Sequence, residues 1–341
     1  MKRRNFIRNT SQAGLALSFL GMYACKETPS KEAIPEEEAA VFEPFFKLSL
    51  AQWSLHKMIW EEKLNPMDFA KKAKDLGFEG LEYVNQLYNK ELEKRGNNNN
   101  AIISLAEDLK KISDQQQMKN QIMMVDLQGD ENLLSTPNQT HRKQGVENHK
   151  IWIDATAILG CHSMRINLFG SNDEEIWKEN SVASLKELSE YASEKNVNII
   201  VENHGYLSSN GALMAEVMET VNKENCGTLP DFGNFCLKRE DNKLWDAPCI
   251  EEYDIYKGVE ELMPFAKGVS AKTFNFDENG NETTIDFYKM MKIVKDAGFT
   301  GFVGVEYEGE ELSEEKGILA TKALLLAVAK KLSETSTTNQ A

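Results

Sequence analysis

The chain has 341 residues, which is enough for two average domains or for one barrel of about 250 residues with appendages. Its composition, 41% hydrophobic and 27% charged, is that of a globular protein and argues against wholesale disorder. The formal net charge of −15 argues against a nucleic-acid partner, because an acidic surface repels a polyanion.

Residues 1–25 have the layout of an export signal. A basic start that contains Arg3 and Arg4 precedes an apolar run over 13–24, which ends at Cys25. The paired arginines resemble a twin-arginine signal, and the residues before Cys25 resemble a lipoprotein-processing box. We therefore expect an exported, periplasmic protein with a membrane anchor on a lipidated Cys25. Cleavage nearby without lipidation is the alternative.

Residues 26–44 are polar, contain proline and lack periodicity, which is typical of a tether between a membrane and a domain. From Phe45 on, short apolar runs with strand character recur roughly 30 to 40 residues apart, each followed by a helical pattern, as in repeated βα units. These runs begin near Lys47, Gly80, Gln121, Ser163, Asn198, Gly227, Gly268 and Phe302.

An internal repeat supports this interpretation. The pattern Lys-Asp-x-Gly-Phe-x-Gly occurs at 74–80 and again at 295–301, and each copy precedes a strand with Glu-Tyr, at Glu82 and at Glu306. The first strand lacks a following Gly-x-Gly-x-x-Gly loop, which argues against dinucleotide binding. The sequence therefore predicts an α/β protein with a single (β/α)8 TIM barrel over 45–333 and a disordered tail over 334–341.

Besides Cys25, the chain has four cysteines whose spacing does not match a zinc site. Most are expected to be core residues. A twin-arginine route exports protein that has already folded in a reducing cytoplasm, which makes a structural disulfide less expected than in other exported proteins. The pair Cys236 and Cys249 is the one candidate for a bridge.

Polar residues stand at the ends of the predicted strands, where the active-site face of a barrel lies. Because side chains alternate along a strand, every second residue shares a face. Counting in this way places the following side chains at the barrel mouth: Glu82, Asp126, Arg165, Asn167, Glu202, His204, Asp231, Lys272, Glu306 and Glu308.

Several carboxylates in one narrow mouth repel each other, so a positive charge is expected among them. A divalent metal is one solution, because oxygen ligands favour magnesium or manganese, with cobalt or zinc if an imidazole joins. Direct neutralisation by Lys272 and Arg165 is the other solution.

Three motifs carry a resemblance to a known family: Val-Glu-Asn-His at 201–204, Leu-Pro-Asp-Phe-Gly-Asn at 229–234 and Gly-Val-Glu-Tyr at 304–307. In this order, on the fifth, sixth and eighth predicted strands, they resemble the xylose-isomerase-like superfamily of TIM barrels, of the sugar phosphate isomerase/epimerase type. The resemblance covers nearly the whole chain after Phe45.

The resemblance implies that Glu202, Asp231 and Glu306 hold a divalent metal. The histidine that the superfamily carries on the seventh strand is Ser270 here, and the histidine usual after the strand-six aspartate is Asn234. Two alternatives follow. Water or His204 completes the metal site, or Lys272 replaces the charge of the metal.

The resemblance also implies proton transfer through an enediolate. Glu202 and Glu306 are the acid–base candidates, and a metal or Lys272 would polarise the carbonyl. We therefore expect an exported isomerase or epimerase that acts on a sugar or keto-sugar. Two alternatives stay open: a lyase or dehydratase that eliminates across a 3-keto-glycoside, and a barrel that binds sugar without catalysis.

Sugar-binding residues are predicted around the same mouth, where aromatic faces can stack on sugar C–H surfaces. Trp53 and Trp245 are among six aromatic residues near the mouth, two of which we expect to contact a ligand. For His56, a structural role is as strongly expected as a binding role. The residues predicted to bind substrate are Trp53, His56, Glu82, Arg165, Asn167 and His204.

Overall fold

The computed structural model describes residues 42–338, apart from residue 244. The expected export signal at 1–25, the anchor on Cys25 and the tether up to residue 41 lie outside the described residues. Inside this range, no helix is both long enough and apolar enough to cross a membrane. The packed domain begins at Phe42, slightly before the predicted start at residue 45.

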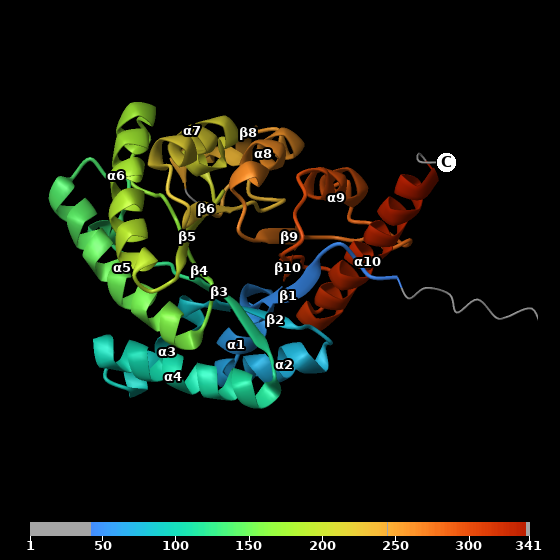
Figure 1. Ribbon diagram of the computed structural model, residues 1–341, viewed down its shortest axis with the longest axis horizontal. Helices are drawn as coiled ribbons and strands as arrows, with labels where there is room; N and C mark the ends of the chain where they lie inside the picture. Colours follow the sequence, from blue (N-terminus) through green and yellow to red (C-terminus); the bar gives the residue numbers. More distant parts are fainter. Residues whose placement is uncertain (1–41, 244, 339–341) are drawn as a thin grey trace, which may run out of the picture. The chain divides into compact units, whose positions relative to one another are not determined.

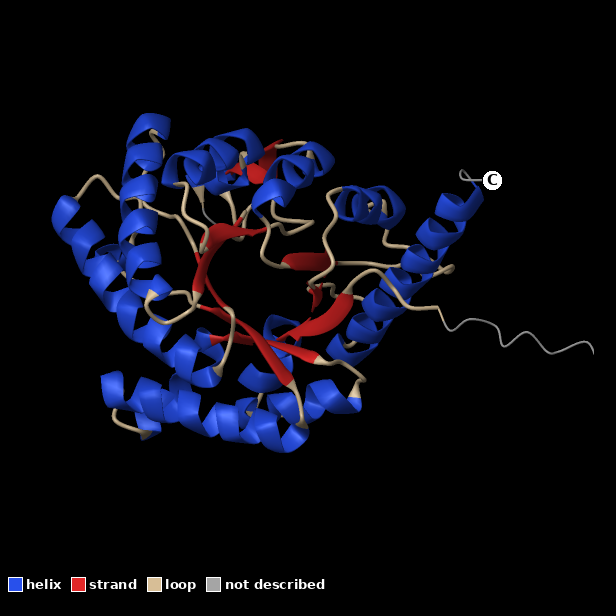
Figure 2. Cartoon of the chain, in the orientation of Figure 1, coloured by secondary structure: helices blue, strands red, loops and turns tan. Residues whose placement is uncertain are grey.

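Eight parallel strands form one curled sheet with helices around it (Figures 1 and 2). Their order is β6-β5-β4-β3-β2-β1-β10-β9, which confirms the predicted α/β barrel. Each predicted strand start agrees with the structure to within two residues. The barrel strands are β1 (Lys47–Ala51), β2 (Gly80–Val84), β3 (Lys119–Met124), β4 (Ser163–Ile166), β5 (Asn198–Glu202), β6 (Cys226–Leu229), β9 (Val269–Thr273) and β10 (Phe302–Tyr307).

The barrel closes between β6 and β9 through isolated parallel bridges, one of which joins Asp231 to Ser270. A continuous ladder is interrupted here because Pro230 has no N–H to donate. The Pro230 carbonyl still accepts from the Ser270 N–H at 2.9 Å, and the Phe232 N–H donates to the Ser270 carbonyl at 3.2 Å. We call this junction the seam.

Helices cover the outer face of the sheet (Figure 2). The last helix continues to Thr338, so the tail predicted to be disordered from residue 334 is helical as far as it is described. Its apolar face extends through Leu325, Ala329 and Leu332, which are buried and therefore keep it packed on the barrel. The helices are α1 (His56–Trp60), α2 (Phe69–Asp75), α3 (Asn89–Lys94), α4 (Asn99–Gln116), α5 (Gln139–Leu159), α6 (Glu174–Ser193), α7 (Gly211–Val221), α8 (Ile255–Leu262), α9 (Phe287–Asp296) and α10 (Glu314–Thr338).

The internal repeat forms the same structure twice. Helices α2 and α9 are each followed by a glycine in the left-handed region, Gly77 at φ +76° and Gly298 at φ +74°. A side chain is strained at such φ values, so glycine ends the helix and turns the chain into a strand. The two turns lead into β2 and β10, which flank β1, and so bring Glu82 and Glu306 to neighbouring parts of the barrel.

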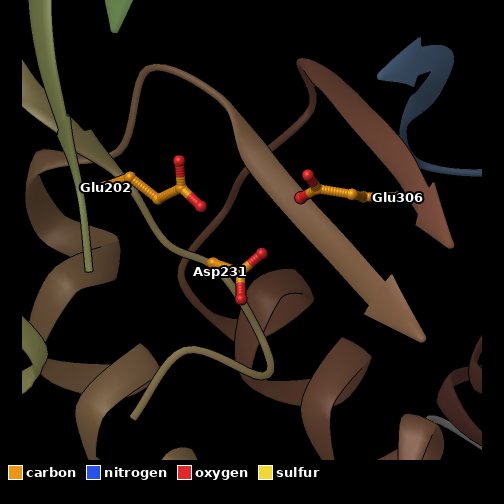
Figure 3. A group of neighbouring side chains, drawn as sticks. All are labelled: Glu202, Asp231 and Glu306. Atoms are coloured by element: carbon orange, nitrogen blue, oxygen red, sulfur yellow. The ribbon is translucent and has the colours of Figure 1, made fainter. Parts of the chain in front are cut away.

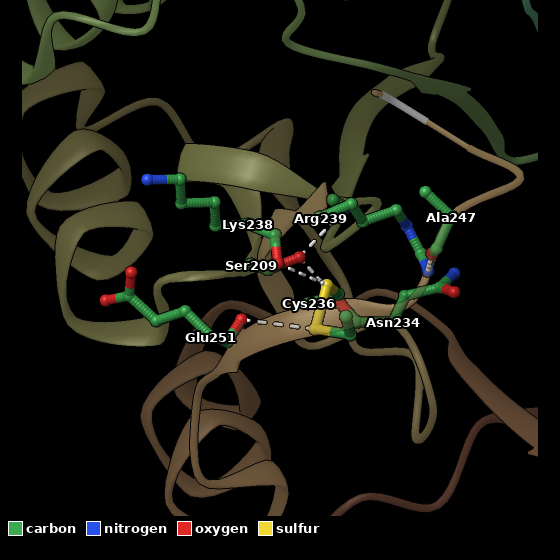
Figure 4. Close-up of a disulfide and its surroundings, with 9 residues drawn as sticks. Ser209, Asn234, Cys236, Lys238, Arg239, Ala247 and Glu251 are labelled. Carbon is green, nitrogen blue, oxygen red and sulfur yellow. Dashed lines mark hydrogen bonds between the residues drawn. A yellow bond between two sulfur atoms is a disulfide. The ribbon is translucent and has the colours of Figure 1, made fainter. Parts of the chain in front are cut away.

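The long segment after β6 forms an antiparallel ribbon of β7 (Cys236–Arg239) and β8 (Cys249–Glu252). A disulfide joins Cys236 to Cys249 across the two strands (Figure 4). This is the cysteine pair that the sequence singled out. Cys161 and Cys226 are buried free thiols, in agreement with a core role.

Both faces of the barrel strands are buried, as expected for a parallel sheet covered by helices. On β5, Ile200 and Glu202 share one face and Ile199 and Val201 share the other, and all four side chains are buried. Charged residues at the strand ends are therefore shielded from water. In this buried environment, electrostatic interactions between them are stronger than they would be in water.

Candidate active site

Glu202, Asp231 and Glu306 converge at the carboxyl ends of three strands, with their carboxyl groups turned toward one another (Figure 3). Glu202 is the last residue of β5, Asp231 follows β6, and Glu306 lies on β10. One carboxylate oxygen from each residue lies within 4.8 Å of the others, and all three residues are buried. The structure thus brings together the three predicted metal ligands.

Two neighbouring side chains orient Glu202. Arg165 Nε lies 2.9 Å from Glu202 Oε2, and Asn234 Nδ2 donates to Glu202 Oε1 at 3.0 Å. Arg165 also forms an ion pair with Asp126, at 2.7 Å from Nη1 to Oδ1. Because Arg165 is buried between both carboxylates, it fixes Glu202 and neutralises part of its charge.

Asp231 accepts hydrogen bonds at both oxygens. Oδ1 accepts from the backbone N–H groups of Gly233 at 2.8 Å and Asn234 at 2.9 Å. Oδ2 accepts from Ser270 Oγ at 2.6 Å, and the same Oγ lies 2.7 Å from Glu306 Oε2. A hydroxyl has one proton to donate, so Ser270 serves one of the two carboxylates at a time and holds them together.

Lys272 on β9 is the cation beside these carboxylates. Its Nζ lies 3.7 Å from Asp231 Oδ2, 3.8 Å from Glu306 Oε2 and 3.3 Å from Glu308 Oε1. Burial alone would lower the pKa of Lys272, but Asp231, Glu306 and Glu308 outweigh burial and raise that pKa well above its usual value. Lys272 is therefore a permanent positive charge at neutral pH.

Burial raises the pKa values of Glu202 and Asp231 toward neutral pH. Burial raises the pKa of Glu202 to about 8, against the opposing effect of Arg165. Burial likewise raises the pKa of Asp231 to about 7, although Lys272 opposes it. Acid–base catalysis requires groups that gain and lose protons in this range.

Asn167 and His204 extend the network toward the rim of the barrel. Asn167 Nδ2 donates to Asp126, and Asn167 Oδ1 lies 3.0 Å from His204 Nδ1. Burial, followed by the charges of Arg165 and Lys272, lowers the pKa of His204 well below its usual value. A neutral imidazole beside an amide suits hydrogen bonding to sugar hydroxyls.

A cavity of about 690 Å³ opens over these residues. We call it the active-site cavity. Of the six residues predicted to bind substrate, all but Glu82 line it, and so do the three predicted catalytic residues. The predicted substrate-binding and catalytic residues in its lining are Trp53, His56, Arg165, Asn167, Glu202, His204, Lys272 and Glu306.

Aromatic side chains flank the cavity on two sides. Trp53 stacks on His56 with ring centroids 4.6 Å apart, near the end of β1. Near the end of β5, Trp245 lies 4.8 Å from the His204 ring and 6.3 Å from that of Phe169. Because β1 and β5 are four places apart in the ring of eight strands, the two aromatic groups face each other across the barrel.

Glu82 lies beneath the active-site cavity. It is 1% exposed, and Val84, two residues further along β2, is the residue that lines the cavity. Ser49 Oγ donates to Glu82 Oε1 at 2.5 Å, while Oε2 lacks a hydrogen-bond partner in the described part of the chain. Burial raises the pKa of Glu82 to about 8. The predicted face is correct, but the residue is one layer too deep to contact a ligand in this cavity.

Residues 70–327 match the family model described as xylose isomerase-like TIM barrel. The chain belongs to the xylose isomerase-like TIM barrel family. A search of curated protein sequences finds no match for it.

Several solved structures share this fold. L-ribulose 3-epimerase has a TM-score of 0.64 and 13% identity, over 87% of this chain and 98% of that chain. A D-tagatose 3-epimerase-like protein has a TM-score of 0.61 and 17% identity, over 85% and 100%. The 3-keto-D-glucoside 4-epimerase from E. coli has a TM-score of 0.60 and 12% identity, over 83% and 99%. At these identities the likeness shows the fold alone.

This xylose isomerase-like barrel has Ser270 and Asn234 at the two positions where the resemblance led us to expect histidine. Both replacements contact the carboxylates directly. Ser270 links Asp231 to Glu306, and Asn234 binds Glu202. The carboxylates are therefore held in place by neutral donors that occupy the positions of the missing imidazoles.

The three carboxylates can hold a divalent metal. The acidic groups around Arg165 and Lys272 outnumber these two cations, which leaves negative charge in excess. Ser270 Oγ adds a neutral oxygen beside two of the carboxylates. A set of oxygen donors of this kind suits magnesium or manganese better than a soft metal.

Phe169 and Gln86 are among the residues in the cavity lining that the sequence interpretation missed. A signal for both was present. Phe169 continues the alternation of Arg165 and Asn167 beyond β4, and Gln86 continues the alternation of Glu82 beyond β2. The alternation was applied only up to the expected end of each strand, whereas the same face continues into the following loop.

Proposed function

We propose that this protein is an exported sugar isomerase or epimerase that acts on a sugar or keto-sugar through an enediolate. The observation that carries the proposal is the convergence of Glu202 and Glu306 in one cavity, beside the buried ammonium group of Lys272. Three solved structures of the same fold support the proposal: L-ribulose 3-epimerase, 3-keto-D-glucoside 4-epimerase and a D-tagatose 3-epimerase-like protein.

The roles of the residues follow from their charges. The ammonium group of Lys272 makes the C–H beside a nearby substrate carbonyl more acidic, because it stabilises the negative charge that develops on the enediolate oxygen. Glu306 takes the proton from carbon, and Glu202, with a pKa of about 8, holds a proton that it can return. Protonation of the same carbon on the opposite face gives an epimer. Protonation of the neighbouring carbon, with transfer of the hydroxyl proton from one enediolate oxygen to the other, gives an isomer.

Glu202, Asp231 and Glu306 would also hold the divalent metal, manganese, magnesium, cobalt or zinc, which when bound supplies a Lewis acid for the carbonyl oxygen. Asp231 takes part only as a ligand in this scheme. Its two backbone hydrogen bonds keep it in place whether or not it is protonated.

His204, Asn167, His56 and Trp53 bind and orient the sugar. The first three offer donors or acceptors for hydroxyl groups, and the Trp53 ring offers a face for C–H groups. Export is proposed from the N-terminal sequence, with lipidated Cys25 as the anchor. The Cys236–Cys249 disulfide supports it, because such bridges persist in oxidising compartments.

Exchange of a carbon-bound proton tests the proposal. The purified chain is incubated with a panel of aldoses, ketoses and 3-keto-glucosides in deuterated water, and deuterium on carbon is followed by NMR. We expect exchange with at least one sugar, and a decrease of at least a thousandfold in Glu202→Gln and Glu306→Gln. Glu310→Gln is the matched control, because Glu310 lines the rim of the same cavity and is exposed.

The products separate the remaining possibilities. Retained mass with changed stereochemistry supports epimerisation or isomerisation, and loss of water or an aglycone assigns elimination instead. Binding of sugars without exchange in any of them would contradict the proposal and leave a sugar-binding barrel.

A further inference from the structure

A second cavity, of about 1200 Å³, adjoins the active-site cavity. It extends over α3, the first turn of α4 and one face of α5, helices that pack on one side of the barrel (Figure 1). The proposed proton transfer does not use it. We call this cavity the amide groove, because its lining includes Gln86, Asn89, Asn97, Asn99 and Gln128.

The amide groove shares five lining residues with the active-site cavity. Asp126, one of the shared residues, is paired with Arg165, which in turn contacts Glu202. Two successive ion pairs therefore connect the groove to a reacting carboxyl group, and a molecule held in the groove can extend toward the active-site cavity. The residues that line both cavities are Gln86, Asp126, Leu127, Gln128 and Asn132.

The amide side chains of the groove are available to a ligand. Within the described residues, the five amides that define the groove form no side-chain hydrogen bond. An amide presents donors and an acceptor together, which matches a hydroxyl group. Gln86 is half-buried at the junction of the two cavities, and the preceding Asn85 fixes the chain there through two hydrogen bonds with the Asp126 backbone, at 2.9 and 3.3 Å.

The charge of the groove limits the kind of ligand. Glu93, Glu131, Glu147 and Asp154 line it, and Lys150 is the one cation among the described residues of its lining. Lys150 is already paired with Glu147. Carboxylates in excess repel phosphates and uronic acids, so the groove suits an uncharged molecule rich in hydroxyl groups.

We propose that the amide groove binds the second sugar unit of an uncharged glycoside whose first unit lies at Glu202 and Glu306. The inference rests on the proposed function and names its substrate class: a disaccharide or longer glycoside in preference to a free monosaccharide. Gln86, at the junction, contacts the linkage or the second ring and determines this preference.

Binding of matched sugars tests the proposal. Dissociation constants for the full-length chain are measured by NMR titration with four pairs: methyl β-glucoside and cellobiose, methyl α-glucoside and maltose, methyl β-galactoside and β-1,4-galactobiose, and methyl β-xyloside and xylobiose. In at least one pair we expect the disaccharide to bind at least tenfold more tightly. Gln86→Leu lowers this ratio, and Asn89→Trp, which fills the groove at an exposed position, reduces it to about one.

Gln115→Leu is the matched control, because Gln115 is exposed near the far end of α4 and does not line the groove. Equal affinities within every pair, a ratio that Asn89→Trp does not change, or no binding of any sugar would each overturn the inference. If carbon-bound protons exchange in monosaccharides and no disaccharide is preferred, the proposed function stands and the groove inference is wrong. If disaccharides are preferred and no proton exchanges, the groove inference stands and the proposed reaction is wrong.

Discussion

Ser270 Oγ lies 2.6 Å from Asp231 Oδ2, across the seam that closes the barrel. The hydroxyl stands at the position where the resemblance led us to expect a metal-binding histidine, and it lies within hydrogen-bonding distance of both Asp231 and Glu306. The Ser270 hydroxyl therefore stabilises the acidic site by donating a hydrogen bond to Asp231 or Glu306.

Ser270→Ala removes the donor that Asp231 and Glu306 share. We expect a loss of about 2 kcal/mol in the free energy of unfolding, because a buried hydrogen bond to a charged group is removed, and a decrease of about tenfold in proton exchange with sugar. Denaturant unfolding and the deuterium assay measure the two effects. Ser181→Ala is the control, since Ser181 is buried and its hydroxyl lacks a partner within the described range. Equal losses in both variants would contradict the role of Ser270.

Glu82 makes stability depend on pH. In the folded chain its pKa is about 8, whereas the ordinary value is 4.5, so the folded state keeps a proton that the unfolded chain releases. Between these values, the free energy of unfolding falls as pH rises, by up to about 1.4 kcal/mol per pH unit for this group. A glutamine at position 82 does not titrate, so the slope in Glu82→Gln loses the contribution of one proton. Urea unfolding at several pH values measures the slope, and exposed Glu79→Gln, just before the same strand, should leave it unchanged. An unchanged slope in Glu82→Gln would show that Glu82 is ionised in the folded state.

The ribbon disulfide positions Trp245. This tryptophan lies in the loop between β7 and β8, and its ring is 4.8 Å from His204 at the rim of the active-site cavity. A Cys236→Ser/Cys249→Ser variant should raise KM for the sugar about tenfold and change kcat by less than about twofold, and Trp245→Ala should do the same. A reducing agent should reproduce the change in the unmodified chain and have no further effect on the double variant. A lower kcat at constant KM would argue against a binding role.

A metal-binding experiment distinguishes a bound divalent metal from Lys272 as the source of positive charge in the site. If the carboxylates hold a divalent metal, manganese should raise the Tm of the chain by mass action, and Asp231→Asn should abolish the increase. Asp130→Asn, at an exposed position on the cavity rim, is the matched control and should retain it. No increase with manganese, magnesium, cobalt or zinc would assign the charge role to Lys272 alone.

The sequence was sufficient to predict the barrel and the direction in which its polar side chains point. Alternation along a strand is a local property, so Glu202, Arg165, Lys272 and Glu306 were predicted on the inner face and are found there. Height along the barrel axis is not local. It depends on the register between strands, and for that reason Glu82 was predicted at the mouth but lies one layer below it.

Contacts that arise from loops could not be predicted. The approach of Trp245 to His204 depends on a ribbon that the disulfide closes, and the amide groove depends on how α3 and α5 pack beside the loop after β3. In these loop regions, residues far apart in sequence come into contact, and no periodic pattern in the sequence predicts such contacts. The two replaced histidines were visible in the sequence, but only the structure shows that Ser270 and Asn234 took over contacts with the same carboxylates.

The seam at Pro230 has a mechanical consequence. Ser270 donates its backbone N–H to the Pro230 carbonyl and its hydroxyl to Asp231, so one residue both fastens the barrel wall and spaces the acidic groups. Because Glu306 lies on β10, which pairs with β9, a separation of β6 from β9 at the seam would move Asp231 away from Glu306. A ligand held by both Asp231 and Glu306 would link the two sides of the seam. Its addition should therefore slow the solvent exchange of backbone amides at the seam more than that of amides in the opposite wall.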